Sequence, residues 1–477
     1  MLRADLSLYK NTRVCVALSG GADSVALLCL FCEEAPAYGI ALSAVHVEHG
    51  IRGRESEEDA AFVCALCKEQ GVPLRLVRAD IPARAKEAGV GLEEAARLFR
   101  RGVFYRLLKA GAADYVATAH HAGDNAESVL LHLFRGAALT GAGGIRAFVP
   151  ASALADGAEG VNEVADGVNE GAYGMNEVAD GPAAGLPFAR RGLVRPFLAC
   201  TRAEIVAYLR GRGRAWREDA TNADTAYARN FVRRAVLGSA KEVFPAAEKN
   251  LYAFSRLARE DDDFLFAEAA RILRRGRGGY AVAADAPRPL FLRACVLALR
   301  ALGVQKDYTY ANFQDVFALA EGKTGRRADL PCGVCAVKEY GRVVLYRPQA
   351  AAGSYPLAEG VFGFGPFSVR AFRAPAPPAF SRGAFPRTLY LAGDAEGELR
   401  LRREGDRFTP FGGGDRKLKE FFIDKKIPRR ERDLLPVLAA GSRVLAVCGV
   451  EIAEQVKTDP ARPADVWVLE TIYKGED

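Results

Sequence analysis

Residues 12–35 read TRVCVALSGGADSVALLCLFCEEA and decide the fold. The first seven residues are mostly apolar and partly β-branched, which predicts a short strand. From residue 22 onward apolar residues recur at helical spacing, which predicts a helix. The glycine-rich turn SGGADS (residues 19–24) joins the two. A strand, a glycine-rich turn and a helix in this order indicate the first unit of a parallel α/β sheet.

The same alternation of strand and helix patterns continues over the first 135 residues. We expect strands at 41–47, 73–79 and 114–120, and helices at 55–70, 91–110 and 124–134. Such alternation predicts a mostly parallel sheet with helices on both faces. The expected fold class is therefore α/β at the start of the chain, followed by a helical domain and a small mixed α+β C-terminal domain.

The length and the changes in composition predict three domains. The chain has 477 residues, and about 150 residues per domain is usual. We expect an α/β domain over 1–215, a helical domain over 216–327 and a β-rich region over 328–477, with its core at about 398–470. The boundaries follow the points where apolar helical patterns replace the alternation and where short β-rich runs then replace the helices.

One segment, about 147–189, interrupts the first domain. It contains a near repeat, GVNEVADG at 160–167 and GMNEVADG at 174–181. It holds seven acidic residues and no Lys or Arg, and it has few aromatic residues. With so little apolar surface it cannot offset the entropy of ordering, so we expect a flexible acidic insertion in a surface loop. An electrostatic mimic of RNA is the alternative interpretation.

Overall composition excludes several classes of protein. Half of the residues are hydrophobic and 26% are charged, as in ordinary folded proteins. The sequence has no run of 18 apolar residues and no secretory signal at its start, so we expect a cytoplasmic protein with no membrane partner. The net charge is +7, and outside the acidic segment it is about +14. That asymmetry favours a polyanionic partner such as nucleic acid.

Ten cysteines are too few for a disulfide scaffold in a chain of this length. Six of them form three Cys-x-x-Cys pairs. Two interpretations stay open, namely small buried hydrophobic residues or a zinc or iron–sulfur site. The pairs are Cys29–Cys32, Cys64–Cys67 and Cys332–Cys335.

The turn SGGADS carries the strongest chemical signal. Glycines allow a tight turn and a close approach of the backbone to a ligand. Free N–H groups at the start of a helix bind anions, and the serine hydroxyls add donors. The turn therefore predicts an anion site built from Ser19, Gly20, Gly21, Ala22, Asp23 and Ser24.

A second polar cluster, TAHHAGDNAES (118–128), follows a predicted strand and opens a helix. Asp124 and Glu127 are three residues apart and so share a helix face. Together with Asp23 they predict a magnesium site, held mainly by Asp23 and Asp124, although plain dipole capping is the alternative. His120 and His121 lie beside these acids and are candidate contacts to a phosphate.

Arg97 and Arg100 form a third candidate group in GLEEAARLFRR (91–101). They share a helix face, and arginines suit recognition of phosphate groups. The alternative is a solvated charged face on which Glu93 pairs with Arg97.

Taken together, these motifs resemble one family, the tRNA(Ile)-lysidine synthases. SGGADS resembles the pyrophosphatase-type loop of the N-type ATP hydrolases. HVEHGIRG (46–53), EEAARLFR (93–100) and TAHHAGDNAES match the family's nucleotide-binding domain in order. WREDATN (216–222) with YARNFVR (227–233) is similar to its next conserved segment. The sequence from Gly405 to Leu438 looks like its C-terminal RNA-contacting domain.

The resemblance implies a fold and a reaction. The fold is a parallel-sheet nucleotide-binding domain of the adenine nucleotide alpha hydrolase type. The enzyme uses ATP, with Mg²⁺, to adenylate O2 of the wobble cytidine in the isoleucine tRNA with a CAU anticodon, releasing pyrophosphate. The amine of free L-lysine then attacks C2, AMP leaves, and lysidine is formed. The charging identity of the tRNA changes from methionine to isoleucine. Whether the enzyme is a homodimer stays open.

The chain departs from the family at one site position. The family commonly has Asp-Asp-Gln where this chain has Gly123-Asp124-Asn125. The missing carboxylate shifts the expected metal or catalytic role to Asp124. The roles that the resemblance implies are catalysis for Asp23, Asp124, Glu127, His120, His121, Arg97 and Arg100.

Two basic segments predict the tRNA surface. Residues 190–234 hold eleven arginines against four acids, and residues 402–433 hold eleven basic against seven acidic residues. Phosphate contacts from such segments make affinity fall with salt. The expected tRNA-binding residues are Arg195, Asp219, Asn222, Arg229, Asn230, Arg233, Lys417, Lys419, Lys425, Lys426, Arg429 and Arg430.

Two other functions compete with this interpretation. The first is another adenylating tRNA-modifying enzyme of the same superfamily, such as a thiolating enzyme, which needs reactive or cluster-binding cysteines at the site. The second is a non-catalytic RNA-binding homologue, for which Gly123 is the only support.

Overall fold

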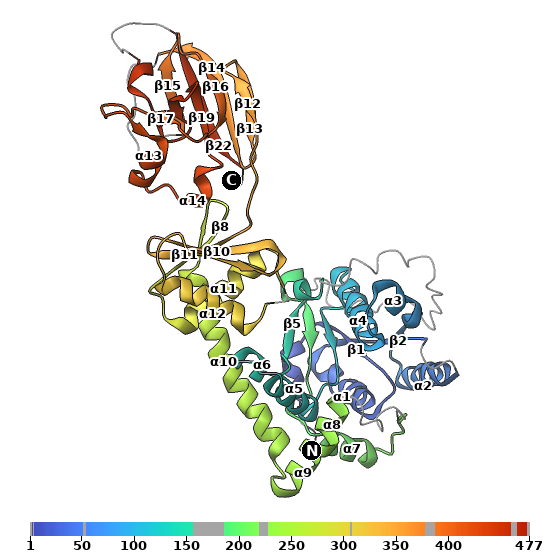
Figure 1. Cartoon of the computed structure of the whole chain (residues 1–477). Helices are drawn as coiled ribbons and strands as arrows, with labels where there is room; N and C mark the ends of the chain where they lie inside the picture. Colours follow the sequence, from blue (N-terminus) through green and yellow to red (C-terminus); the bar gives the residue numbers. More distant parts are fainter. Residues whose placement is uncertain are drawn as a thin grey trace. The chain divides into compact units, whose positions relative to one another are not determined.

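A computed structural model describes residues 2, 4–50, 54–155, 186–218, 228–305, 308–376, 387–458 and 465–474. The chain divides into two compact units, Met1–Asp263 and Phe264–Asp477. In Figure 1 the first unit runs from blue to yellow-green and the second from yellow-green to red. The expected boundaries at 215 and 327 fall inside these units, and the finer division into three domains stays a prediction.

The first unit is built on a six-stranded sheet with the order β3-β2-β1-β4-β6-β5. Neighbouring strands are parallel except that β5 runs antiparallel to β6 at the edge. The predicted, mostly parallel sheet is therefore confirmed. The strands are β1 (Arg13–Ala17), β2 (Ala41–Glu48), β3 (Leu74–Arg78), β4 (Tyr115–Ala117), β5 (Phe148–Pro150) and β6 (Gly192–Val194).

Helices cover both faces of this sheet, because alternate residues of its strands are apolar on both sides. Val14 and Val16 of β1 pack against the side of α1 and α7, whereas Cys15 packs against the side of α3 and α4. The helices of this unit are α1 (Ala22–Tyr38), α2 (Arg54–Gln70), α3 (Ile81–Ala88), α4 (Leu92–Lys109), α5 (Ala122–Phe134), α6 (Leu139–Ala142), α7 (Arg202–Gly211), α8 (Ala228–Phe231) and α9 (Leu237–Val243), and α10 (Ala247–Ile272) begins in this unit and ends in the second.

A buried aspartate fixes the chain where it returns to the domain after the acidic segment. Asp114 is fully buried, and it forms ion pairs with Arg13 (3.0 Å) and Arg191 (3.4 Å). Its carboxylate also accepts a hydrogen bond from the backbone N–H of Leu186 at 2.9 Å. Residues 156–185, with the repeat, lie outside the described residues.

The predicted start of the insertion at residue 147 is too early. Residues 148–150 form β5, and the short 3₁₀ helix η2 (Ala151–Leu154) follows. Ala151 and Leu154 are fully buried in the core beside α4. Their apolar side chains hold this part of the chain in the core of the domain. The acidic composition of the segment as a whole gave no sign of these two buried residues.

The second unit begins with a five-stranded antiparallel sheet, β7-β8-β11-β10-β9, against which two helices pack. The hairpin of β7 and β8 lies where the sequence predicted only helices, because its Arg-Gly-rich residues carry little strand pattern. The elements are β7 (Arg274–Gly276), β8 (Gly279–Ala283), α11 (Arg288–Ala301), α12 (Tyr310–Glu321), β9 (Arg327–Leu330), β10 (Val334–Glu339) and β11 (Arg342–Tyr346).

The rest of the second unit is rich in strands, as predicted. One sheet has the order β12-β16-β19-β20-β17-β18, with β21 beside β20, and a second has the order β13-β14-β22-β15. The elements are β12 (Ser354–Pro356), β13 (Gly360–Phe364), β14 (Phe367–Pro375), β15 (Thr388–Ala392), β16 (Glu398–Leu401), β17 (Arg407–Phe408), β18 (Arg416–Lys417), α13 (Leu418–Asp424), α14 (Arg429–Arg432), β19 (Pro436–Ala440), β20 (Arg443–Val447), β21 (Glu451–Ile452) and β22 (Asp465–Tyr473).

Within the part of the chain that the structure describes, no helix combines the length and the apolar character needed to cross a membrane.

Candidate functional site

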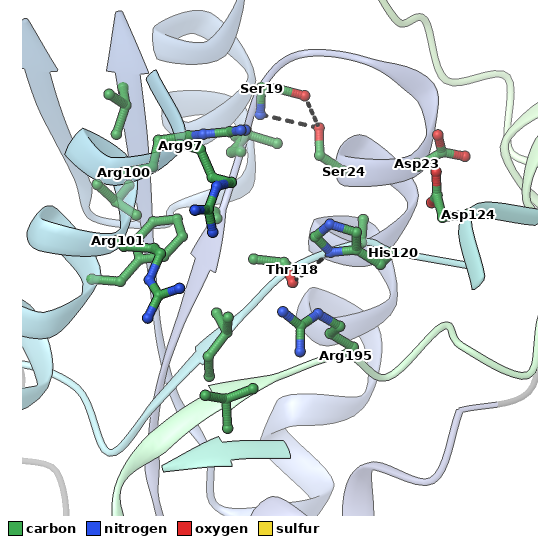
Figure 2. Close-up of a pocket in the computed structure, with 18 of the residues that line it drawn as sticks. Ser19, Asp23, Ser24, Arg97, Arg100, Arg101, Thr118, His120, Asp124 and Arg195 are labelled. Carbon is green, nitrogen blue, oxygen red and sulfur yellow. Dashed lines mark hydrogen bonds between the residues drawn. The ribbon is translucent and has the colours of Figure 1, made fainter. Parts of the chain in front are cut away.

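The loop between β1 and α1 closes on itself through its two serines. Ser24 Oγ accepts a hydrogen bond from the backbone N–H of Ser19 (3.1 Å) and donates one to the carbonyl of Gly21 (3.0 Å). The two serine hydroxyls lie 3.1 Å apart (Figure 2). Gly20 has a φ of +90°, which strongly favours glycine. Gly21 caps α1 without a side chain, so the first N–H groups of α1 can meet an anion.

A cavity of about 550 Å³ opens beside this loop, at the carboxyl ends of the parallel strands. Figure 2 shows the acids Asp23 and Asp124 on one side of it and three arginines of α4 on the other. Its polar lining consists of Ser19, Asp23, Ser24, His49, Glu93, Arg97, Arg100, Arg101, Thr118, His120, Asp124, Arg195 and Arg229.

Asp23 and Asp124 meet at one imidazole, that of His121. Nδ1 of His121 accepts the backbone N–H groups of Gly123 (3.0 Å) and Asp124 (3.4 Å), so the ring proton lies on Nε2. Nε2 is 3.5 Å from Asp124 Oδ2 and 3.9 Å from Asp23 Oδ2. His121 is the N-cap of α5 and does not line the cavity. It therefore lies against both carboxylates but outside the lining of the cavity.

Burial and neighbouring charges affect the two carboxylates differently. Burial raises the pKa of Asp23 above its usual value. Burial alone would also raise the pKa of Asp124, but His121, His120 and Arg229 outweigh it and lower that pKa. Asp124 therefore stays ionised more readily than Asp23.

The two acids fit a magnesium ion. Asp23 Oδ1 is buried and has no hydrogen-bond partner among the described residues. Mg²⁺ prefers oxygen ligands, and it commonly takes one or two carboxylates together with substrate phosphates. No group of three or more His, Cys, Asp or Glu residues within the described ranges could hold a metal ion by itself. Asp23 and Asp124 would thus hold the ion jointly with a bound nucleotide.

Glu127 does not join this pair, which corrects the prediction that it supports the metal. Its side chain is 2% exposed and lies outside the lining of the cavity. It accepts hydrogen bonds from Arg229 Nε (2.8 Å) and Arg233 Nε (2.5 Å). Arg229 and Arg233 also lie 3.4 and 3.6 Å from Asp124 Oδ1. Glu127 thus anchors two arginines beside the site, because a buried carboxylate requires cationic partners.

His120, unlike His121, faces the cavity. Its Nδ1 is 3.0 Å from the hydroxyl oxygen of Thr118. Burial, followed by the charge of Arg195, lowers the pKa of His120 to about 4. The ring is therefore neutral at neutral pH and can act there only as a neutral donor or acceptor.

Four arginines form the basic wall of the cavity. Arg97 and Arg100 lie there as predicted, and Arg101 and Arg195 join them. Arg97 forms two hydrogen bonds with Glu94 (2.7 and 2.8 Å). The alternative prediction, in which Arg97 pairs with Glu93, is therefore wrong. Burial, then the charges of Arg101 and Arg259, lowers the pKa of Arg195 to about 10.

Crowding accounts for the glycine at position 123. A Cβ atom there would lie 2.8 Å from Cε1 of His121 and 3.4 Å from Glu248 Oε1. With His121 folded back as the cap of α5, no aspartate fits at 123 without a shift. The position of His121 therefore explains why the chain lacks a carboxylate at 123. Asp124 remains in the lining of the cavity.

The basic residues of 190–234 face inward more than the sequence predicted. Arg195 and Arg229 line the cavity and Arg233 pairs with Glu127, although all three were expected to bind tRNA. Asn230 is half-buried. Asp219 and Asn222 lie outside the described residues.

In the second unit, five of the six expected tRNA contacts are exposed. Lys425 forms an ion pair with Glu451 (2.5 Å). Arg430 contradicts its prediction as a surface residue, because its side chain is only 10% exposed and pairs with Glu339 and Glu431. The exposed residues are Lys417, Lys419, Lys425, Lys426 and Arg429.

Sequence reasoning missed Arg101 and Thr118 as cavity residues. Thr118 follows the last residue of β4, Ala117, and so lies at the carboxyl edge where ligands bind, a signal that could have found it. Arg101 follows Arg100 directly on α4, and helical spacing alone did not place it on the same wall.

The cysteine pairs lie away from this cavity in the described residues. Cys29 and Cys67 are buried in the core between α1 and α2, and burial raises the pKa of both thiols. Cys332 is exposed, and Cys335 is buried on β10. Cys29 and Cys67 therefore fit the interpretation as small buried hydrophobic residues.

Comparisons with known proteins agree over most of the chain. Residues 2–240 match the family model of the PP-loop domain, and residues 398–468 match that of the TilS substrate C-terminal domain. Three similar proteins are tRNA(Ile)-lysidine synthases. The one from Caldanaerobacter subterraneus is 29% identical (95% of this chain, 92% of the relative). The one from Geobacillus kaustophilus is 31% identical (93% of this chain, 92% of the relative). The one from Symbiobacterium thermophilum is 32% identical (93% of this chain, 90% of the relative).

Proposed function

Because this chain belongs to the tRNA(Ile)-lysidine synthase family, an enzyme family that forms lysidine in tRNA(Ile), we propose how its cavity performs that reaction. One observation carries the proposal. A single cavity joins the PP-loop, which binds ATP, to the carboxylates of Asp23 and Asp124 on one side and the arginines of α4 on the other, with Arg195 also in its lining. This combination suits transfer of an adenylyl group from ATP to a base that enters from the RNA.

In the first step, O2 of the wobble cytidine attacks the α-phosphorus of ATP. The bond from that phosphorus to the bridging oxygen of the β-phosphate breaks, and pyrophosphate leaves. Ser19, Ser24 and the first N–H groups of α1 hold the leaving pyrophosphate, because they present donors from a rigid turn.

Asp23 and Asp124 would hold Mg²⁺, which supplies charge neutralisation at the phosphates when it is bound. His121 keeps the two carboxylates turned toward each other through Nε2. His120 is neutral at neutral pH and donates a hydrogen bond to a phosphate or to the adenylated base.

The arginine wall stabilises negative charge that develops away from the loop. Arg97, Arg100, Arg101 and Arg195 line the same cavity as the PP-loop, and guanidinium groups bind phosphate oxygens in pairs. Apolar side chains lie among them, including Phe104 and Leu193, and offer a surface for a base.

In the second step, the amine of free L-lysine attacks C2 of the activated cytosine. The bond between C2 and the adenylated oxygen breaks, AMP leaves with that oxygen, and the amine loses a proton. The product is lysidine. The tRNA is the isoleucine tRNA with a CAU anticodon, which thereby changes from methionine to isoleucine identity.

The exposed lysines of α13 and its flanks supply contacts to the tRNA backbone. Such contacts position the RNA but do not read its sequence. The thiolating alternative lacks support in this cavity, because no cysteine is among its described lining residues. The alternative of a non-catalytic homologue does not fit the family, whose members are synthases.

A direct assay tests the proposal. Purified protein is incubated with ATP, Mg²⁺, labelled lysine and the CAU-anticodon isoleucine tRNA, with a wobble-uridine variant of that tRNA as control. We expect label only in the cytidine tRNA, and a nucleoside heavier by lysine less water after digestion. Release of pyrophosphate without lysine transfer would support the adenylation step and reject lysine as the nucleophile of the second step. Absence of both would reject the mechanism.

A further inference from the structure

Arg217 has no part in the proposed reaction, yet its backbone pairs with the PP-loop. The N–H of Arg217 donates a hydrogen bond to the carbonyl of Gly20 at 3.0 Å, and Arg217 forms a parallel β-bridge with Gly21. Arg217 lies in the chain that follows α7, far from the loop in the sequence. A distant segment therefore fixes one carbonyl of the loop.

The bond to Gly20 decides which way one peptide group of the loop faces. In a planar trans peptide the C=O and the N–H point in opposite directions. Because the Gly20 carbonyl points to Arg217, the N–H of Gly21 points the other way, toward Ser19 Oγ at 3.4 Å. Ser19 lines the cavity (Figure 2). N–H groups bind a phosphate and carbonyls repel it, so this is the orientation that the anion needs.

The two glycines leave this peptide group free to turn over. Such a turn changes ψ of Gly20 and φ of Gly21, and glycine accepts values that other residues do not. Gly20 has a φ of +90° and Gly21 a φ of −73°. The turned form would present a carbonyl to the phosphate in place of an N–H. The loop therefore binds an anion well only while the Gly20 carbonyl is held outward.

The side chain of Arg217 fixes the position of its own N–H. Its Nε lies 2.8 Å from Asp59 Oδ1 and its Nη2 lies 3.2 Å from Glu58 Oε2, and both acids belong to α2. Its stem passes beside Gly20, where a Cβ atom would lie 3.8 Å from Cγ of Arg217. Such exposed ion pairs contribute little to stability. Their effect is to place the backbone of residue 217 against the loop.

We propose that Arg217 is a positioning residue, which holds the Gly20–Gly21 peptide in the orientation that binds the pyrophosphate part of ATP. The inference rests on the proposed function, which places that group on the PP-loop. Arg217 is not among the described residues that line the cavity, so it acts through the loop. Without its support, only the molecules whose peptide faces the right way bind phosphate, and the apparent affinity falls by that fraction.

Arg212 provides a matched control. It lies in the same chain after α7 and forms two hydrogen bonds with Glu33 of α1, at 2.5 and 2.8 Å. Its side chain is 40% exposed, compared with 39% for Arg217. Arg212→Ala and Arg217→Ala therefore each remove one half-exposed ion pair with an acid of a neighbouring helix. Of the two arginines, Arg217 is the one whose backbone bonds to the loop.

The test measures binding of three probes to the full chain by calorimetry, with Mg²⁺ present. The probes are inorganic pyrophosphate, ATP and AMP, and AMP lacks the two phosphates that the loop would hold. The variants are Arg217→Ala, Arg217→Lys and Arg212→Ala. A fourth, Asp59→Asn, weakens the anchor on α2 without changing residue 217. Tm is measured for each.

We expect Arg217→Ala to weaken binding of pyrophosphate and ATP about fivefold each and to leave AMP binding unchanged. Arg217→Lys keeps the stem and a charge toward Asp59, so it should recover most of the affinity. Asp59→Asn should weaken pyrophosphate binding about twofold. Arg212→Ala should bind all three probes like the wild type. The Tm of the two alanine variants should fall by similar small amounts.

Wild-type affinity for pyrophosphate in Arg217→Ala would overturn the inference. So would an equal loss of affinity in Arg212→Ala, or a parallel loss for AMP, because either would mean a general disturbance of the domain. Absence of pyrophosphate binding in the wild type would reject the role of the PP-loop in the proposed function, and this inference with it. These readouts do not depend on lysine transfer, so failure of that assay alone leaves them intact.

Discussion

The two basic segments, 190–234 and 402–433, look alike in sequence but use their charge differently. In the first, Arg195, Arg229 and Arg233 turn toward the cavity or toward Glu127. In the second, Lys417 and Lys419 project from the ends of β18 and α13 into solvent.

The difference follows from what each segment packs against. Residues after 227 form α8, which lies over the acidic first turns of α5 and so finds Asp124 and Glu127 as partners. The α13 segment instead buries Phe421 and Phe422 in the core, which leaves its charged face outside. A count of charges therefore finds a basic segment but does not tell whether it serves a site or a surface.

The largest effect should come from Asp124, the acid that the first segment surrounds. Replacing Asp124 with Asn keeps the shape and the cap of α5 but removes the charge. We expect pyrophosphate release to fall by about 10³-fold or more, because the site loses an ionised carboxylate that would hold Mg²⁺ beside the phosphates. The measurement is single-turnover release of pyrophosphate from ATP with tRNA. Near-normal release with an unchanged Tm would remove Asp124 from the machinery.

Arg430 is the exception within the second segment, and its neighbour provides the control. Arg430→Ala leaves Glu339 and Glu431 buried without their partner, so we expect a loss of about 3 kcal/mol in unfolding free energy. Arg429 is exposed, and Arg429→Ala should change stability by less than about 0.5 kcal/mol. Urea unfolding of both variants measures the difference. Equal unfolding free energies for the two variants would mean that the ion pairs of Arg430 with Glu339 and Glu431 do not stabilise the fold.

In the first segment, Arg233→Ala should destabilise less than this. Glu127 loses its 2.5 Å partner but retains Arg229, so we expect a loss of about 2 kcal/mol. The activity should fall too, because Asp124 loses the charge of Arg233, which lies 3.6 Å from its Oδ1. The same urea experiment, followed by pyrophosphate release, separates the two effects. If tRNA affinity alone drops, Arg233 is a surface contact after all.

Arg195 connects the first segment to a pH effect. It helps hold the pKa of His120 at about 4, below the ordinary value of 6.5. Between these values the unfolded chain binds a proton that the folded chain does not, so stability falls as pH falls from 6.5 to 4. We expect His120→Asn to lose less Tm than the wild type between pH 7 and pH 4.5. Parallel Tm curves for the two proteins would show that His120 titrates normally.

The smallest effect belongs to the surface lysines. The double substitution Lys417→Ala/Lys419→Ala should weaken tRNA binding about threefold and lower the salt slope by about two, with no change in Tm. Binding titrations at three salt concentrations test this. An unchanged salt slope would mean that the exposed lysines of the second segment do not contact the tRNA backbone.

The sequence was enough to predict the parallel sheet, the PP-loop and the arginines of α4, because each follows from a local pattern. Strand periodicity, the glycines of residues 19–24 and helical spacing are properties of neighbouring residues. The capping box of Thr201 and Glu204 at the start of α7 is local in the same way, because the two residues are three apart.

Contacts between distant residues could not be predicted in this way. Glu127 and Arg233 are 106 residues apart, and Glu339 and Arg430 are 91 apart, so nothing local pairs them. The exchange of roles between Glu127 and His121 has the same origin. Both lie at or near the start of α5, and only the packing of α8 and the loop of Asp23 decides which of them lies against Asp23 and Asp124.

Asp114 has a consequence for how this gene can change. It fastens Arg13, Leu186 and Arg191 to one buried carboxylate, and the N–H of Ala151 donates to the carbonyl of Arg191 at 2.9 Å. The chain therefore leaves the domain and returns to it at fixed points. The entropy of closing a loop rises only slowly with its length. The repeat between these points can therefore be duplicated, shortened or lost over generations without a change in the residues that line the cavity.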